Sequence, residues 1–174
     1  MQLRQLERPH FFNGKLLTAD DLQLEQDYHR NKARLHNRFL HGWGVVQGLN
    51  VSLDRGSVVV SPGLALDCAG NELILPQEER LSLVNSTGRQ WVVVRYVELP
   101  IGQVPLPSGN LEPSRVQEAV AVELSSINPL AGHGGQRARR VGCGVTHALP
   151  LATVAKRGTR WRVIPLKSSL HCCR

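Results

Sequence analysis

The side chains best suited to chemistry in this chain are its cysteines and histidines, because sulfur and imidazole donors are the preferred ligands of zinc. They gather near the C-terminus, and the candidate metal set is Cys143, His147, His171, Cys172 and Cys173. No Cys-x-x-Cys knuckle holds this set together, and part of it lies in a chain end of the kind that frays. We therefore favour free thiols, and predict neither a metal nor a cofactor.

A second group of histidines lies on or beside a predicted helix: His29, His36 and His41. Helical zinc pairs are usually four residues apart, whereas His36 and His41 are five apart, a spacing that should point the two rings away from each other on an α-helix. No acid completes an HExxH pattern. These rings are expected to be solvated or to lie in an interface.

Standard catalytic motifs are absent from the sequence. It contains no GxSxG elbow, no Walker loop and no GxGxxG after a strand. Asp67 and Glu72 flank a predicted hairpin turn and could form a carboxylate pair, although acidic residues are common in turns. Because nothing assembles a nucleophile, a base and an oxyanion site in one neighbourhood, we predict that the chain is not an enzyme.

Basic residues are concentrated in the second half of the chain. Residues 1–87 carry nine Lys/Arg and ten Asp/Glu, a balance of −1, whereas residues 88–174 carry twelve and four, a balance of +8. The candidate basic patch is Arg137, Arg139, Arg140, Arg160 and Arg162. Such a patch can meet nucleic acid, an anionic surface or an acidic partner subunit, or it can be a solvated face.

Two binding functions remain alternatives to a structural role. A small nucleic-acid-binding module would use the basic C-terminal segment, but single-strand binders need several stacking rings, and the whole chain has three Trp, three Phe and two Tyr. Nucleic acid is therefore not the favoured partner. A carbohydrate-binding domain would instead use Trp43, Trp91 or Trp161 as its stacking platform.

One helix is predicted from about Ala19 to about Leu40. Thr18 can accept from free N–H groups at its start, and Asp21 occupies the acidic position of a capping box. Acids precede bases along the helix, which suits its dipole, and Gly42 supplies the stop. Its apolar stripe is thin and consists of Leu22, Tyr28, Leu35 and Phe39. Such a seam packs across the β domain or against a neighbouring subunit.

An extended arm, residues 1–17, precedes this helix and includes a tight turn at Asn13-Gly14. Phe11 and Phe12 could anchor the arm in a groove of a partner, or they could cover the chain's own core. After the helix, Trp43 is expected to cover the junction with the first strand. The predicted hinge residues there are Gly42, Gly44 and Gly48.

From Trp43 onward, short alternating runs separated by Gly, Pro and Asn turns predict about eight strands. Pro100 to Pro113 is expected to be a long extended connection, because it holds four prolines. The predicted fold is mainly β, a small antiparallel sandwich or open barrel with one N-terminal helix and an extended N-terminal arm. We divide the chain into an arm and docking helix, 1–41, and a β-rich domain, 42–174.

Location is predicted from what the sequence lacks. The charged opening, Met1–His10, has no apolar signal region, and no apolar run approaches the ~20 residues needed to cross a bilayer. We expect synthesis in the cytoplasm, with cysteines that are not paired in disulfides.

Two sequence blocks resemble a known family. Phe11 to Leu49 contains the pattern LHNRxLHGWGVVxGL at residues 35–49, and residues 60–76 follow the pattern VxPGxALDxxGNExxxP. Both are similar to a family found in phage-tail-like gene clusters. Weaker similarities at residues 94–98, 114–118, 149–152 and 161–163 extend the match over most of the chain.

The resemblance implies a component of extracellular contractile injection systems, of the baseplate, fibre-attachment or tail-end adaptor type. It implies docking to other subunits of a multi-protein particle, with several copies of the chain in it, and no catalytic residues. Assembly would begin in the cytoplasm, and the chain would be released as part of an extracellular particle.

Overall fold

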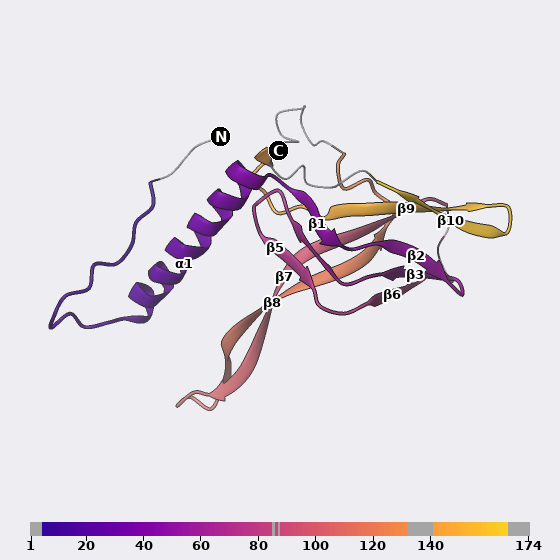
Figure 1. Cartoon of the computed structure of the whole chain (residues 1–174). Helices are drawn as coiled ribbons and strands as arrows, with labels where there is room; N and C mark the ends of the chain where they lie inside the picture. The colour runs from indigo at the N-terminus through magenta and orange to yellow at the C-terminus, as the bar shows by residue number, and fades with distance from the viewer. Residues whose placement is uncertain (1–4, 85, 87, 132–140, 167–174) are drawn as a thin grey trace.

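The computed structural model describes residues 5–84, 86, 88–131 and 141–166, and Figure 1 shows their arrangement. Helix α1 (Ala19–His36) follows an extended arm and continues into a π-helical turn, η1 (Asn37–His41). The strands among the described residues are β1 (Gly44–Gly48), β2 (Val51–Asp54), β3 (Ser57–Val60), β4 (Gly63–Leu66), β5 (Glu72–Leu75), β6 (Glu79–Ser82), β7 (Gln90–Pro105), β8 (Leu111–Ser125), β9 (Leu149–Arg157) and β10 (Arg160–Pro165). The predicted fold class is confirmed: antiparallel sheets form most of the structure, with one N-terminal helix and an arm.

Three antiparallel sheets make up the β body, with strand orders β1-β4-β5, β2-β3-β6 and β10-β9-β7-β8. The first two are joined where β1 leads into β2 and β3 leads into β4, beside the paired residues Gly48 and Gly63. A Cβ on Gly48 would lie 2.1 Å from the Pro62 carbonyl oxygen, and Gly48 has a φ of 66°. Glycine is therefore required where the hairpin bends from one sheet into the next.

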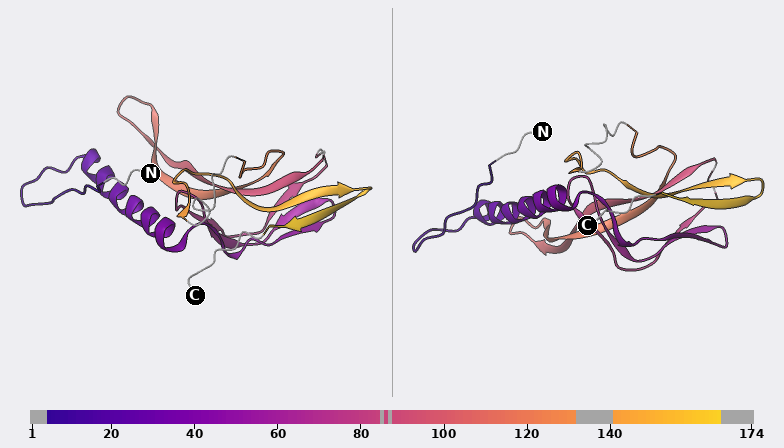
Figure 2. Two further views of the ribbon diagram at one scale, coloured as in Figure 1. Left: turned by 90° about the horizontal axis from the view of Figure 1, so that it is seen from above. Right: turned by 45° about the horizontal axis from the view of Figure 1, so that its top comes forward.

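The core lies between the sheets and is built almost entirely from Val and Leu. Val58, Val60, Leu73, Val92 and Val94 have no exposed surface. Leu149, Leu151 and Val154 of β9, which belongs to the same sheet as Val92 and Val94, complete it. Figure 2 shows the resulting curved layers, with α1 beside them and not between them.

Pro100–Pro113, expected to be a long extended connection, is extended, but it belongs to strands: β7 and β8 form one long hairpin there. Their pairing runs from Trp91 opposite Ser125 to Pro105 opposite Leu111. Strand β9 pairs with β7 only as far as Val94. Beyond that point the hairpin is a two-stranded ribbon, in which each strand has a free side where a proline without an N–H can be accommodated.

The predicted capping residues at the start of α1 are confirmed. The Asp21 backbone N–H donates to Thr18 Oγ1 at 3.2 Å, and the Thr18 N–H donates to the Asp21 carboxylate at 3.2 Å, which completes the capping box. The Lys15 ammonium donates to the same carboxylate at 2.8 Å. These bonds, led by the one from Lys15, hold the pKa of Asp21 below its ordinary value.

The end of the helix differs from the expectation. The α-helical pattern stops at His36, and the π-turn carries the chain to Gly42, which has a φ of 84°. Gly42 donates its N–H to the Asn37 carbonyl, five residues back, at 2.9 Å. None of the described helices is both long enough and apolar enough to span a membrane.

Candidate docking surface

Helix α1 is held to the β body by polar contacts. Arg34 Nε donates to Asn71 Oδ1 at 2.6 Å, and Asn37 Nδ2 donates to the Gly70 carbonyl at 3.0 Å. Arg30 forms an ion pair with Glu98 on β7. Within Ala19–His36 no residue is buried. The contacts therefore orient the helix without burying an apolar face of it against the body.

The turn between β4 and β5, residues 67–71, is the platform for these contacts. The buried Asp67 carboxylate accepts hydrogen bonds from the Ala69 N–H, the Asn71 N–H and Asn71 Nδ2, at 2.8, 2.8 and 2.7 Å. Asp67 therefore builds the turn. Glu72 accepts a bond from Asn37 at 3.4 Å instead of pairing with Asp67, so the possible carboxylate pair is not formed.

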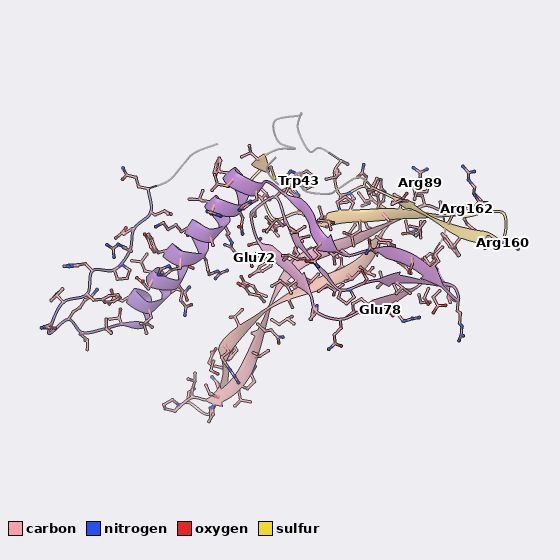
Figure 3. The ribbon with its side chains drawn as sticks, viewed as in Figure 1. Trp43, Glu72, Glu78, Arg89, Arg160 and Arg162 are labelled. Atoms are coloured by element: carbon pink, nitrogen blue, oxygen red, sulfur yellow. The ribbon has the colours of Figure 1, made fainter. Side chains whose placement is uncertain are left out.

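Gly70 allows the close approach of α1 to this turn. Its φ is 90°, and a Cβ at this position would lie 2.3 Å from the Arg34 carbonyl oxygen. A real Cβ cannot come so close to a backbone oxygen, so any other residue would push the helix away. Figure 3 shows Glu72, at the edge of the same turn, lying between α1 and the body.

A third segment, residues 142–146, packs against the same turn. Gly144 donates its N–H to the Cys68 carbonyl at 3.0 Å, and Asn71 Nδ2 contacts Thr146 Oγ1 at 3.3 Å. Cys68 is 2% exposed, and burial raises the pKa of its thiol to about 12. Cys68 is therefore a structural thiol, whereas Cys143 is exposed.

The apolar side of α1 lines a cavity of about 490 Å³ that the arm and the β body, at residues 69 and 144–146, line as well. Leu24, Tyr28 and Leu35 contribute to its lining from the helix, and Leu6 contributes from the arm. Of the predicted seam, Tyr28 and Leu35 thus lie together in this cavity. Leu22 and Phe39 lie outside it and are 54% and 41% exposed. The cavity is a groove between the arm, α1 and the edge of the body, and the chain itself only partly fills it.

The arm reaches beyond the start of α1 before it turns back into the helix (Figures 1 and 2), and Phe11 and Phe12 directly precede the turn at Asn13-Gly14. Phe11 is 48% exposed and Phe12 is 63% exposed, so the alternative that they cover the chain's own core is wrong. The predicted turn beside them is confirmed, since Gly14 has a φ of 90° and the Lys15 N–H donates to the Phe12 carbonyl at 3.1 Å.

Of the predicted hinge glycines, Gly42 and Gly44 lie where α1 joins the body, whereas Gly48 lies at the far end of β1. Each has a positive φ: 84° at Gly42, 136° at Gly44 and 66° at Gly48. Trp43 lies between α1 and β1 (Figure 3) and packs against the core cluster. The chain therefore leaves the helical segment through backbone angles that favour glycine, and a hinge at these positions stays a prediction.

The expectation that His36 and His41 point apart is wrong. Their Nε2 atoms are 3.2 Å apart, and the ring centroids are 5.1 Å apart. The π-turn is the reason, because its hydrogen bonds join residues five apart, which brings positions i and i+5 to one face. The five-residue spacing was the sequence signal for this contact, but the prediction applied the geometry of an α-helix to it. His29 instead contacts Glu25 at 3.0 Å.

The predicted metal set can be placed only in part. Cys143 is exposed and its sulfur contacts the backbone of Val145, while His147 is half-buried. His171, Cys172 and Cys173 lie outside the described residues. Within the part of the chain that the structure describes, no group of three or more His, Cys, Asp or Glu side chains is placed to hold a metal ion.

The predicted basic patch can likewise be placed only in part. Arg160 and Arg162 are exposed on β10, whereas Arg137, Arg139 and Arg140 lie outside the described residues. All three tryptophans are half-buried, and Trp43 and Trp161 pack against the core. The structure therefore presents no fully exposed tryptophan as a stacking platform for a base or a sugar.

Comparison with known proteins identifies the fold. No protein-family model matches the sequence, and no curated protein matches it significantly. A chain in the type VI secretion system TssK-TssF-TssG baseplate subcomplex is similar in structure, with a TM-score of 0.53 and 14% identity, over 94% of this chain and 61% of that one. A crystal structure of TssK gives a TM-score of 0.48 at 16% identity, and covers 91% of this chain and 41% of its own. This chain thus spans less than two thirds of the length of these proteins.

Proposed function

We propose that this chain is a non-catalytic structural subunit of a phage-tail-like contractile injection particle, and that it docks to neighbouring baseplate or tail proteins. The docking surface is the groove between the arm and α1, together with Phe11 and Phe12. Several copies take part in one particle, which assembles in the cytoplasm before release.

The observation that carries this proposal is the orientation of α1. A helix that served only its own domain would turn its apolar side toward the core. Here Tyr28 and Leu35 line the groove beside the arm, while Arg30 pairs with Glu98 of the β body and Arg34 lies between the groove and the body. An apolar segment of a neighbouring subunit that filled the groove would bury this side and the arm together.

Two independent similarities support the same class of function. The sequence blocks at residues 35–49 and 60–76 resemble a family from phage-tail-like gene clusters. The fold is similar to that of a chain in a baseplate subcomplex of another contractile system. Both similarities include α1 and the β body in one unit.

The test is co-purification of the chain with its particle, after co-expression with the genes that surround its own. The variant Tyr28→Glu/Leu35→Glu places two charges in the groove and should reduce incorporation by about tenfold or more, because charges would be buried in an apolar contact. Gln26→Glu is the matched control, since Gln26 is exposed on α1 and lines neither cavity beside the helix.

Both variants should retain the circular dichroism of the wild type, because neither change reaches the β core. Normal incorporation of the double variant would contradict docking through the groove. Failure of the wild-type chain to co-purify with any sheath, tube or baseplate protein would contradict the proposed function as a whole.

A further inference from the structure

Four arginines lie together at the end of the molecule formed by the β9–β10 hairpin. Arg157 and Arg160 are directly opposite each other across the hairpin, and Arg162 is opposite Ala155. Arg89 directly precedes Gln90, which pairs with Val154, so it enters β7 beside Ala155. Figure 3 shows Arg89, Arg160 and Arg162 at this same end. We call these four exposed residues the arginine face.

The register places the charged groups on one side of the sheet. Residues paired across antiparallel strands share a face, and so do residues two apart on one strand. Arg157, Arg160 and Arg162 therefore project from the same side. Trp161 projects from the opposite side, toward the core cluster. The small side chain of Ala155 leaves open space beside Arg162.

No acid neutralises this face within the described part of the chain, where none of the four arginines takes part in an ion pair. Residues 149–166 carry four basic residues and no acidic one. Arg80, another exposed arginine on a strand, lies instead between Asp54 at 2.8 Å and Glu78 at 2.9 Å. These two acids raise the pKa of Arg80, Asp54 contributing most.

Like charges directly opposite each other on a hairpin are destabilising, so the Arg157–Arg160 pair works against the fold that contains it. Neutral β-forming residues at the two positions would suit the isolated hairpin better. The stability of the chain itself therefore gives no reason for this pair.

We propose that the arginine face binds a carboxylate-rich surface of another protein subunit. Guanidinium groups bind carboxylates through paired, charge-assisted hydrogen bonds, and several arginines on one face would engage several carboxylates. Nucleic acid fits less well, because no exposed tryptophan lies beside the arginines to stack on a base: Trp161 lies on the other side of the sheet, and Trp91, on the same side through its pairing with Thr153, is half-buried. If four phosphate contacts were the only ones, the affinity for nucleic acid would fall steeply as the salt concentration rises.

The arginine face and the groove beside α1 lie at opposite ends of the molecule (Figure 1). A subunit with two such surfaces can bridge two neighbours, one through apolar contacts and one through charge. This inference does not depend on the groove, and the two surfaces can be tested separately.

The experiment uses the full chain and two labelled probes, a poly-glutamate peptide and an oligothymidylate of equal charge, in fluorescence anisotropy at low and physiological salt. We expect poly-glutamate to bind more tightly than oligothymidylate. The triple variant Arg157→Ser/Arg160→Ser/Arg162→Ser should weaken poly-glutamate binding by about tenfold or more. Arg80→Ser should leave it unchanged, because Arg80 is already paired with acids.

The single variant Arg160→Ser, with an expected loss of a few-fold, keeps the test valid if the triple variant does not fold. Unchanged poly-glutamate binding by a folded triple variant would overturn the proposal, as would no binding by the wild type. Tighter binding of oligothymidylate that the triple variant loses would overturn the choice of a protein partner in favour of nucleic acid.

Discussion

The β body and the junction between α1 and that body are held together by different forces. The body buries Val58, Leu73 and Val94 completely, whereas α1 buries none of its residues and is held by hydrogen bonds and ion pairs. Apolar burial is strong and non-directional, whereas a hydrogen bond contributes little net free energy but requires a defined geometry. The body therefore supplies stability, and the junction sets the direction in which the helix points.

This difference suits the docking role that we propose. A helix whose own apolar face is left beside a groove can bury that face against a neighbour without unfolding anything first. The polar contacts to the turn at residues 67–71 hold it ready in one orientation, which reduces the ordering cost of binding.

The largest expected effect is in the body. Leu73→Ala on β5 should lower the free energy of unfolding by about 2–5 kcal/mol, because it removes a side chain with no exposed surface. Ile74→Ala, the next residue on the same strand and 56% exposed, should change it by about 0.5 kcal/mol or less. Urea denaturation of both variants tests the pair. Equal losses would show that β5 is not part of the core as described.

The next effect separates the junction from the body. Gly70→Ala should cost about 1–2 kcal/mol for the left-handed backbone and should also displace α1, because the new Cβ meets the Arg34 carbonyl. Gly56→Ala is the matched control, since Gly56 has a φ of 82° but open space around it.

Hydrogen exchange should show faster exchange in α1 for Gly70→Ala only, while the strands of the body keep their protection. Equal protection of α1 in the two variants would contradict the close approach of the helix to this turn.

A smaller effect is expected at the start of the helix. Thr18→Ala removes the side chain that accepts from the Asp21 N–H and should cost about 1 kcal/mol. The loss should appear as fraying of the first turn, measured by hydrogen exchange at residues 19–22. A reduced melting temperature of the β body with no fraying would contradict this assignment.

The smallest effect concerns pH. Because the folded-state pKa of Asp21 is depressed, its contribution is fully present above the unfolded value of about 3.9 and is lost as pH falls through the lower folded value. Helical circular dichroism of the wild type should therefore decrease below pH ~4 more than that of Asp21→Asn. Identical acid titrations of the two proteins would contradict a role for the ionised carboxylate.

Several elements could be predicted from the sequence because neighbouring residues determine them. Thr18 with Asp21 predicted the start of α1, Asn13-Gly14 predicted the turn in the arm, and Gly42 predicted the end of the helical segment. Alternating apolar residues and turn residues predicted the antiparallel strands. Each signal acts over a few residues, and its backbone geometry is fixed locally.

Contacts between distant segments could not be predicted in this way. The contact of Arg34 with Asn71 shows which part of α1 meets the body, and Leu6 in the groove lining shows which part meets the arm. The long β7–β8 ribbon depends on cross-strand pairing, whereas the four prolines of residues 100–113 by themselves predicted a connection. The arginine face exists only through the register that places Arg157 opposite Arg160.

The π-turn is the clearest example of a feature that the sequence alone does not determine. The sequence fixes that His36 and His41 are five residues apart, but only the geometry of the turn decides whether their rings meet or diverge. Residues 37–41 join a helix held against one turn of the body to a strand fixed in a sheet. The segment between two such fixed ends takes the backbone geometry that connects them, and no local pattern in the sequence specifies it.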